Sequence, residues 1–184
     1  MSTSIEVPPS RAEAMRKLAT DAMTCEALGA LAHGGVHCIL LKGMTLQDRL
    51  YGADHIRRYF DADLFVAPTE LAKARAILTR IGFRLRFDTV SQPFRIPNPH
   101  SEDWRRGLDA IDLHWRLPGV EADDVLAWQV LAGLTETAMV GAMPVTKLNE
   151  EATALLLALH AARHGTSLAK PLTDLSRGIE RIAA

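Results

Sequence analysis

Two aspartates separated by one residue, Asp61 and Asp63, have the clearest chemical potential in this chain. The apolar run that follows them predicts a buried β-strand. Because side chains alternate along a strand, both carboxylates are expected on one face. Like charges at the edge of a core repel each other and lose hydration, so a cation must offset their cost. A divalent metal ion is the natural candidate, although a solvated strand edge or ion pairs with Arg57 and Arg58 would also satisfy them.

A second group lies earlier in the chain, where Lys42-Gly43 separates an apolar run, residues 36–41, from a short helical pattern, residues 44–51. A glycine at a strand-to-helix turn lets the backbone approach a phosphate, and a helix N-terminus favours that anion. The Lys42 ammonium would add a charge on the phosphates. An ordinary surface turn is the alternative interpretation.

A third group lies on the predicted strand 108–117, which carries Asp112 and His114. These residues are two apart and therefore share a face. Three carboxylates on neighbouring strands can hold one or two Mg²⁺ ions, which would neutralise a triphosphate, activate an attacking hydroxyl and stabilise the leaving pyrophosphate. A core histidine with a satisfied hydrogen bond is the alternative for His114.

These segments, in this order, resemble the nucleotidyltransferase superfamily with its polymerase-beta-like fold. The closer resemblance is to an uncharacterised nucleotidyltransferase family whose relatives occur in lasso-peptide and other biosynthetic gene clusters. The resemblance covers most of the chain beyond Gly34. The matching residues are Leu40-Leu41-Lys42-Gly43, Leu50-Tyr51, Arg57, Asp61-Ala62-Asp63-Leu64, Gly82-Phe83 and Ile111-Asp112-Leu113-His114-Trp115, with a weaker match at His160, His164-Gly165 and Asp174-Leu175.

The resemblance implies a metal-dependent enzyme that moves a nucleoside monophosphate from a nucleoside triphosphate, with ATP as the expected one, to an unknown acceptor. Three residues are implied as catalytic groups and ligands of Mg²⁺ or Mn²⁺, namely Asp61, Asp63 and Asp112. Four residues are implied on the nucleotide side or beside the site, namely Lys42, Gly43, Arg57 and His114. A small molecule, a peptide or a transfer RNA could be the acceptor. The alternative is a non-catalytic nucleotide- or partner-binding module that keeps the fold.

The order of the predicted elements favours an α/β (α+β) fold, with a mixed β-sheet core flanked by helices. We expect an N-terminal helix within residues 1–34, a nucleotidyltransferase-like catalytic core over 35–118, and a mostly helical part over 119–184, packed as one unit. In the N-terminal helix, which Ser10 is expected to cap, helical spacing predicts a buried stripe. The stripe comprises Met15, Leu18, Ala22, Cys25, Leu28 and Leu31.

The remaining elements follow from local patterns. Pro68 fits the first turn of a helix that ends near Gly82, and strands are predicted over 83–90 and 93–96. The polar stretch 97–107 is typical of a loop. The last part of the chain predicts a helix over 122–134, a β-hairpin over 136–148 that turns near Gly141, and helices over 150–164 and 172–182, with Asn149 as the cap of the first of these two.

Composition excludes several classes of protein. The 184 residues carry 21 basic and 22 acidic side chains, so the net charge of -1 gives no general attraction to nucleic acid or anionic membrane. The chain has two cysteines, which argues against a disulfide framework and against a zinc site built from cysteines. Without a signal-peptide pattern or a long apolar run, a cytoplasmic protein is expected.

Three polar residues near the C-terminus stay unassigned. His160 and His164 are four apart on a predicted helix, a spacing that suits zinc, but no third ligand accompanies them. Packing or capping roles are favoured. Asp174 is expected to pair with one of these histidines or with Arg57.

Overall fold

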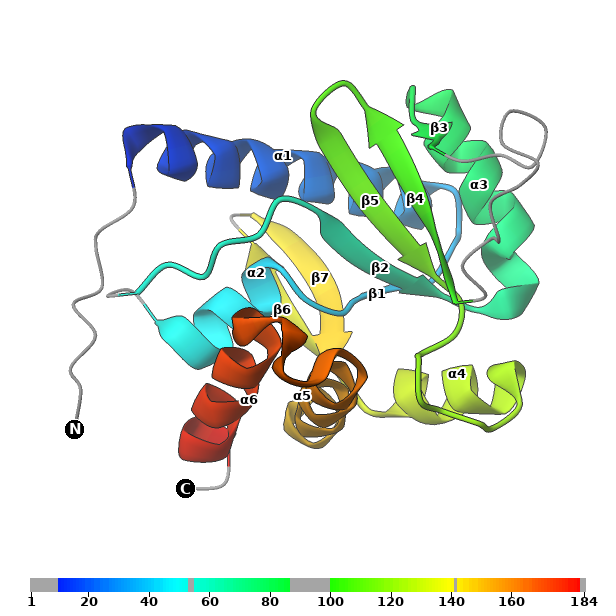
Figure 1. Cartoon of the computed structure of the whole chain (residues 1–184). Helices are drawn as coiled ribbons and strands as arrows, with labels where there is room; N and C mark the ends of the chain where they lie inside the picture. Colours follow the sequence, from blue (N-terminus) through cyan, green and yellow to red (C-terminus); the bar gives the residue numbers. More distant parts are fainter. Residues whose placement is uncertain (1–9, 53–54, 87–99, 141, 183–184) are drawn as a thin grey trace.

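A mixed seven-stranded sheet, in the order β3-β4-β5-β2-β1-β7-β6, forms the centre of the molecule, and helices cover both of its faces (Figure 1). The computed structural model describes residues 10–52, 55–86, 100–140 and 142–182. Strands β1 and β2 are antiparallel, whereas β2 pairs with β5 and β1 with β7 in parallel. The strands are β1 (Cys38–Leu40), β2 (Ala62–Val66), β3 (Arg84–Leu85), β4 (Ser101–Arg106), β5 (Asp109–His114), β6 (Thr135–Val140) and β7 (Met143–Leu148). This arrangement confirms the predicted fold class.

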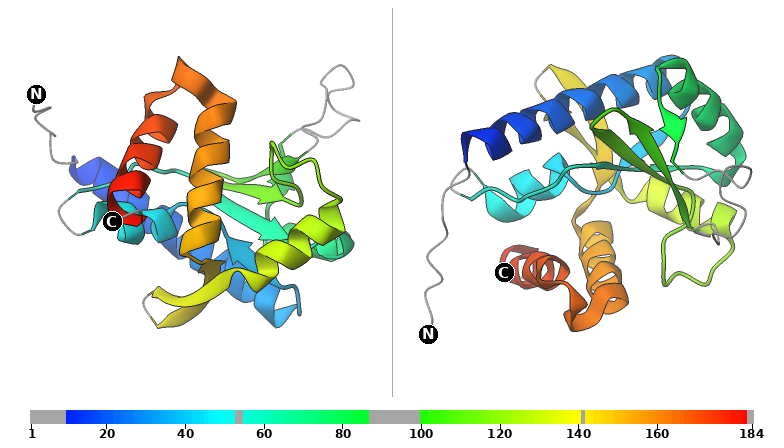
Figure 2. Two further views of the ribbon diagram at one scale, coloured as in Figure 1. Left: turned by 90° about the horizontal axis from the view of Figure 1, so that it is seen from below. Right: turned by 45° about the horizontal axis from the view of Figure 1, so that its top comes forward.

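The helices form two layers. Figure 2 shows α1 and α3 on one side of the sheet, and α5 and α6 on the other. The helical segments are α1 (Arg11–His33), α2 (Met44–Leu46), the π-helical η1 (Gln47–Tyr51), the 3-10 turn η2 (Pro68–Glu70), α3 (Leu71–Arg80), α4 (Asp124–Gly133), α5 (Glu150–His164), the 3-10 turn η3 (Gly165–Ser167) and α6 (Ala169–Ile182). None of the helices in the described residues is both long and apolar enough to cross a bilayer.

Local signals mark two helix starts where the sequence predicts them. The Ser10 side chain accepts a hydrogen bond from the Glu13 N–H, and the Glu13 carboxylate accepts one from the Ser10 N–H, which is a complete capping box. The Asn149 side chain accepts from the Ala152 N–H at the start of α5. Each contact satisfies a backbone donor that the first turn leaves free, so each helix begins at a defined residue.

Alternation along β2 and β5 divides the core between the two faces of the sheet. Leu64 and Leu113 lie in the apolar cluster beneath α1 and α3, whereas Phe65 lies in the cluster beneath α4 and α5. Residues next to Leu64 and Leu113 in the chain therefore point toward the second face. Two of them are Asp63 and Asp112, so burial of the leucines determines the direction of the carboxylates.

The predicted buried stripe of α1 is wrong in its first half. Met15 and Leu18 are 62% and 61% exposed, whereas Leu28 and Leu31 are buried as expected. Only the second half of α1 covers the sheet. The first half lies against the loop before β2, where the Arg16 guanidinium sits 4.7 Å from the centre of the Phe60 ring.

The polar stretch predicted as a loop over 97–107 contains β4 instead. Trp104 is buried in the core and anchors the strand, while its charged neighbours form ion pairs. Glu102 pairs with Arg75, and Asp103 pairs with Arg86 and Arg105. Because these pairs neutralise the side chains at the sheet edge, a strand with an acidic and basic sequence is stable there.

The hairpin predicted over 136–148 is confirmed as β6 and β7, which pair in antiparallel register. Its predicted turn at Gly141 lies outside the described residues, as do the strand predicted over 93–96 and most of the one predicted over 83–90. Within the described part of the latter, β3 spans two residues. The predicted division of the chain near residues 34 and 118 stays a prediction. The sheet itself crosses the second of these boundaries, because β7 pairs with β1.

Candidate active site

Parallel pairing of β2 and β5 brings two carboxylates and an imidazole together. Asp63 is the register partner of Asp112, and Phe65 is the partner of His114. The Nε2 atom of His114 lies 3.2 Å from Asp63 Oδ1 and 3.3 Å from Asp112 Oδ2. One ligand atom from each of the three side chains falls within 4.8 Å of the others. Asp112, the third predicted carboxylate, is therefore part of the same site as Asp63 although it lies far along the chain from the D-x-D pair.

Burial and charge act in opposite directions on these groups. Burial would raise the pKa of Asp63, but the Lys42 ammonium and a hydrogen bond with His114 outweigh it and hold that pKa below its ordinary value. Burial likewise disfavours the His114 imidazolium, yet hydrogen bonds to Asp112 and Asp63 raise the pKa of His114. Its Nδ1 atom is buried and has no hydrogen-bond partner among the residues that the structure describes. The site therefore favours an ionised Asp63 surrounded by positive charge.

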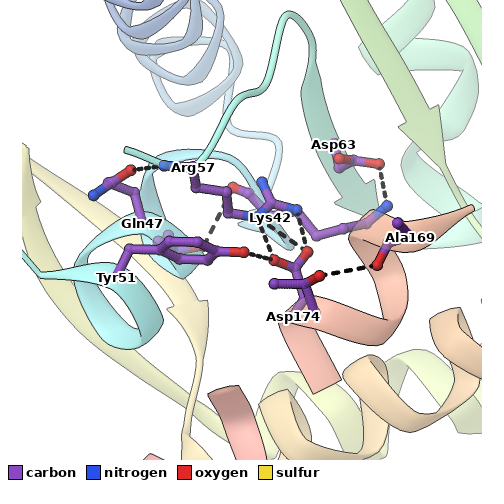
Figure 3. Close-up of polar contacts among 9 residues, drawn as sticks. Lys42, Gln47, Tyr51, Arg57, Asp63, Ala169 and Asp174 are labelled. Carbon is purple, nitrogen blue, oxygen red and sulfur yellow. Dashed lines mark hydrogen bonds and ion pairs between the residues drawn. The ribbon is translucent and has the colours of Figure 1, made fainter. Parts of the chain in front are cut away.

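Lys42, two residues after the end of β1, supplies much of this charge. Its Nζ atom lies 2.8 Å from Asp63 Oδ1, and Figure 3 shows the side chain extended toward that carboxylate beside the first turn of α6. The backbone N–H of Leu41 donates to the carbonyl of Asp63, which ties the two strands together next to the contact. The structure thus brings Lys42 and Asp63 together, as the sequence predicts.

Asp61 lies just before β2 and is more exposed than Asp63. Burial of its carboxyl group, followed by the charge of Asp63, raises the pKa of Asp61, while Lys42 and Lys170 act to lower it. The charge of Asp112 also raises it. Asp61 therefore shares the electrostatic field of the site, although it lies outside the compact group formed by Asp63, Asp112 and His114.

The donor set fits a divalent cation. Carboxylate oxygens are the ligands that Mg²⁺ prefers, and the spacing within 4.8 Å can be bridged by one ion. Imidazole nitrogen is accepted by Mn²⁺ and other transition metals. A cation at this point would share with Lys42 the neutralisation of Asp63. The sequence-predicted ligand set of Asp61, Asp63 and Asp112 stays a prediction, and His114 is an additional candidate ligand.

Gly43 forms the turn between β1 and α2. Its backbone has φ 74° and ψ −122°, a conformation open to glycine and costly for residues with a Cβ. A Cβ at this position would also lie 3.6 Å from the Tyr59 ring and 3.9 Å from the carbonyl oxygen of Asp61. The turn is therefore placed close to the start of the D-x-D segment.

Arg57 is held away from solvent by a buried ion pair. Its guanidinium donates to both carboxylate oxygens of Asp174, at 2.8 to 3.1 Å, and the two residues are 3% and 0% exposed. The Tyr51 hydroxyl donates to the same carboxylate, and the Gln47 side chain accepts from the Arg57 N–H (Figure 3). The network connects α6 with η1 and the loop before β2. Arg57 is thus the partner of Asp174, one of the alternatives raised above, and its predicted contact with phosphate stays a prediction.

Lys170, in the first turn of α6, is a residue that sequence reasoning missed. Burial and the charge of Arg57 lower its pKa, and Asp174, Asp61 and Asp63 act against that shift. Docking of α6 therefore adds a cation to the surroundings of the D-x-D pair. A lysine on a surface helix far along the chain has no local signal that could have identified it.

A pocket of about 200 Å³ opens beside Asp112 and His114. Its opposite wall is α5, which contributes His160, Arg163 and His164. The His160 and His164 rings contact each other edge-on with their centroids 4.8 Å apart. The two histidines therefore face the candidate site, whereas sequence reasoning assigned them to packing or capping.

Comparisons with known proteins agree with this geometry. A family model described as "Uncharacterised nucleotidyltransferase" matches residues 9–181. A search of curated proteins found no match. Among solved structures, the antibiotic-resistance factor ANT(2'')-Ia in solution is 14% identical, with a TM-score of 0.64 over 91% of this chain and 89% of that chain.

Two further solved structures share the fold. A crystal structure of ANT(2'')-Ia with adenylyl-2''-tobramycin is 15% identical, with a TM-score of 0.62 over 88% of each chain. The lincosamide antibiotic adenylyltransferase LnuA, with lincomycin bound, is 15% identical, with a TM-score of 0.55 over 86% of this chain and 94% of that chain. Identities this low show a common fold, and the predicted polymerase-beta-like architecture is consistent with it.

Proposed function

The chain belongs to the uncharacterised nucleotidyltransferase family, and we propose that it transfers a nucleoside monophosphate from a nucleoside triphosphate to an acceptor, with ATP as the first donor to test. Family membership and the shared fold support nucleotidyl transfer in general. The choice of ATP draws on the adenylyl group in one neighbouring structure and on the adenylyltransferase name of another.

A single observation carries the proposal, namely the convergence of Asp63 and Asp112 on His114 Nε2. Carboxylates placed side by side on parallel strands cost free energy unless a cation accompanies them. A site that only stabilised the fold would gain more from an apolar pair at these positions. Retention of both acids beside Lys42 is therefore best explained by the binding of cations and of a polyphosphate.

The reaction assigns a role to each side chain. Lys42 and the Gly43 backbone hold the triphosphate, and Asp63 and Asp112, with Asp61 or His114, would hold Mg²⁺ or Mn²⁺. When bound, such an ion supplies positive charge to the triphosphate and to the leaving pyrophosphate. Asp112 is 36% exposed at its side chain against 10% for Asp63, so Asp112 is the accessible carboxylate.

Bond making and breaking balance without a further reactant. An acceptor oxygen bonds to the α-phosphorus while the bond from the α-phosphorus to the bridging oxygen breaks. The acceptor's proton passes to the Asp112 carboxylate, and pyrophosphate carries away the bridging oxygen. The roles of Lys42 and Gly43 are to bind and orient the phosphates, because neither group exchanges a proton in this step.

A pyrophosphate-release assay tests the proposal. The four common nucleoside triphosphates are incubated with the full chain, Mg²⁺ or Mn²⁺, and a panel of hydroxyl- and phosphate-bearing acceptors. We expect release that EDTA abolishes and that falls at least about a hundredfold in Asp112→Asn.

Asp109→Asn is the matched control. Asp109 belongs to the same strand but to its opposite face, where it pairs with Arg106. This variant should keep the wild-type rate. Full activity in Asp112→Asn would remove the mechanism, whereas nucleotide binding by calorimetry without release on any acceptor would identify the non-catalytic module.

A further inference from the structure

The pocket beside Asp112 combines polar groups with an apolar lining. Besides the polar groups, it is lined by apolar side chains from α5 and from the segments that follow β1 and β5. These side chains are Leu41, Leu117, Pro118, Leu156 and Leu159. Its volume of about 200 Å³ lies below the range of roughly 300–1,000 Å³ of pockets for drug-sized ligands. It therefore suits a compact molecule, or one end of a larger one, with an apolar body.

The wall formed by α5 adds positive charge. Arg163 is exposed, and in the described part of the chain its guanidinium makes no ion pair or hydrogen bond. Burial, followed by the charges of Lys42 and His164, lowers the pKa of His160 to about 4, so its ring is neutral at pH 7. Among the charged side chains in the lining, Asp112 is acidic, whereas Lys42 and Arg163 are basic. The rim opposite the reacting carboxylate is therefore electropositive.

The pocket lies next to Asp112 and borders the phosphate side of the site at Lys42. Its lining includes Asp112 and His114 but neither Gly43 nor Asp61. Lys42 is the point at which the pocket adjoins the turn that we propose to bind the triphosphate, and Gly43 itself lies outside the lining. An occupant of the pocket lies next to Asp112, where the acceptor's proton is received.

We propose that this pocket binds the acceptor, and that the acceptor is a small molecule with a hydroxyl group, an apolar body and an anionic group held by Arg163. That the ligand is the acceptor rests on the proposed function. The chemistry of the ligand is inferred from the pocket alone. A carboxylate or phosphate would match the free guanidinium, whereas an ammonium group would face Arg163 and Lys42.

Three probes with one body and different charges test the ligand chemistry without any turnover. They are 4-hydroxyphenylacetate, 4-ethylphenol and tyramine, which are anionic, neutral and cationic. Ligand-detected NMR titration of the full chain, without nucleotide or metal, should rank their affinities in that order. The anionic probe should bind about fivefold to tenfold more tightly than the neutral one. This preference should vanish in Arg163→Gln and persist in Arg80→Gln, a variant of an exposed arginine on α3.

The anion could also come from the nucleotide, and a competition arm separates the two sources. If the pocket binds the acceptor, saturating ATP leaves 4-hydroxyphenylacetate bound, and Arg163→Gln leaves ATP affinity unchanged. Displacement by ATP, or a matching loss of ATP affinity in Arg163→Gln, assigns the anion site to the triphosphate and overturns the proposal. Equal or tighter binding of tyramine, or no saturable binding of the anionic probe, also overturns it. None of these outcomes depends on pyrophosphate release, so the proposed function stands or fails separately.

Discussion

Asp63 and Asp112 face each other across the parallel pair β2 and β5, and each lies 3.2–3.3 Å from the same His114 nitrogen. Three ionisable groups on two strands therefore share one small volume. Lys42 and His114 supply the positive charge around Asp63. Any ligand that brings a stronger positive charge to this point will stabilise the folded chain, and this is the basis of the first prediction.

Divalent ions should raise the thermal midpoint of the wild-type protein. Binding to the folded state alone adds RT ln(1 + [L]/Kd), about 1.4 kcal/mol at ten times Kd, which corresponds to roughly 3–5 °C for a domain of this size. Differential scanning calorimetry with and without Mn²⁺ measures the shift. Asp112→Asn should lose it, and Asp109→Asn should keep it. An equal shift in all three proteins would place the ion elsewhere.

Loss of Asp174 should destabilise the fold strongly. Asp174→Ala leaves the Arg57 guanidinium buried and unpaired, at a cost of about 3–5 kcal/mol in the free energy of unfolding. Urea denaturation measures this cost.

Asp124→Ala supplies the matched comparison, because Asp124 accepts two hydrogen bonds from Arg116 in the same bidentate way, with the arginine side chain 42% exposed. Because that arginine is exposed to solvent, the loss of Asp124 should cost far less than the loss of Asp174. Similar losses in the two variants would contradict the structural role of the buried pair.

Gly43→Ala should combine strain with a loss of function. Its φ of 74° with ψ of −122° costs a residue with a Cβ about 1–3 kcal/mol, and any relaxation moves the turn proposed to bind phosphate. Denaturation and steady-state kinetics measure the two effects.

Gly107→Ala is the control that separates the effect of backbone strain from the effect on nucleotide binding. Gly107 has φ 59°, and a Cβ there would meet no atom within 4 Å in the described part of the chain, its two chain neighbours aside. We expect lower stability in both variants and a raised KM for the triphosphate in Gly43→Ala alone. Wild-type kinetics in Gly43→Ala would exclude the turn from nucleotide binding.

Protonation of His160 should lower the free energy of unfolding as the pH falls from 6.5 to 4. Its pKa falls from 6.5 in the unfolded chain to about 4 in the fold, so the unfolded chain binds the proton first as the pH drops. The stability associated with the neutral ring is full above pH 6.5 and is lost progressively on the way to pH 4.

Unfolding free energies of His160→Gln measured across this range should decline less steeply than those of the wild type. Depressed carboxyl groups such as Asp63 and Asp174 lose their contribution at lower pH, as the pH falls through values below 3.8. His33→Gln, which changes an exposed histidine, should keep the wild-type slope. Parallel curves for wild type and His160→Gln would refute the prediction.

Features with a local cause were predictable from sequence. Ser10 and Asn149 cap helices through contacts three residues away, and the alternation around Asp63 and around Asp112 places each carboxylate on one face of its strand. The order of motifs also indicated the family. These features depend on backbone geometry and on residues within one turn, which the sequence displays directly.

Features that depend on contacts between distant segments could not be predicted from the sequence. The first half of α1 carries Met15 and Leu18 at helical spacing, yet it extends past the sheet that would have buried them. The strand β4 has a polar sequence and is stabilised by ion pairs with α3 and its neighbours in the sheet. Its hydrophobic pattern alone could not distinguish it from a loop.

By itself, the sequence determined which groups this protein can use: paired acids on a strand, a lysine and glycine at a turn, and a third acid two residues before a histidine. The tertiary structure alone decided their partners. It placed His114 between two carboxylates, buried Arg57 against Asp174, and turned Arg163 toward the pocket. The reason is physical, because charge interactions depend on distances between segments, and those distances follow from how the whole chain packs.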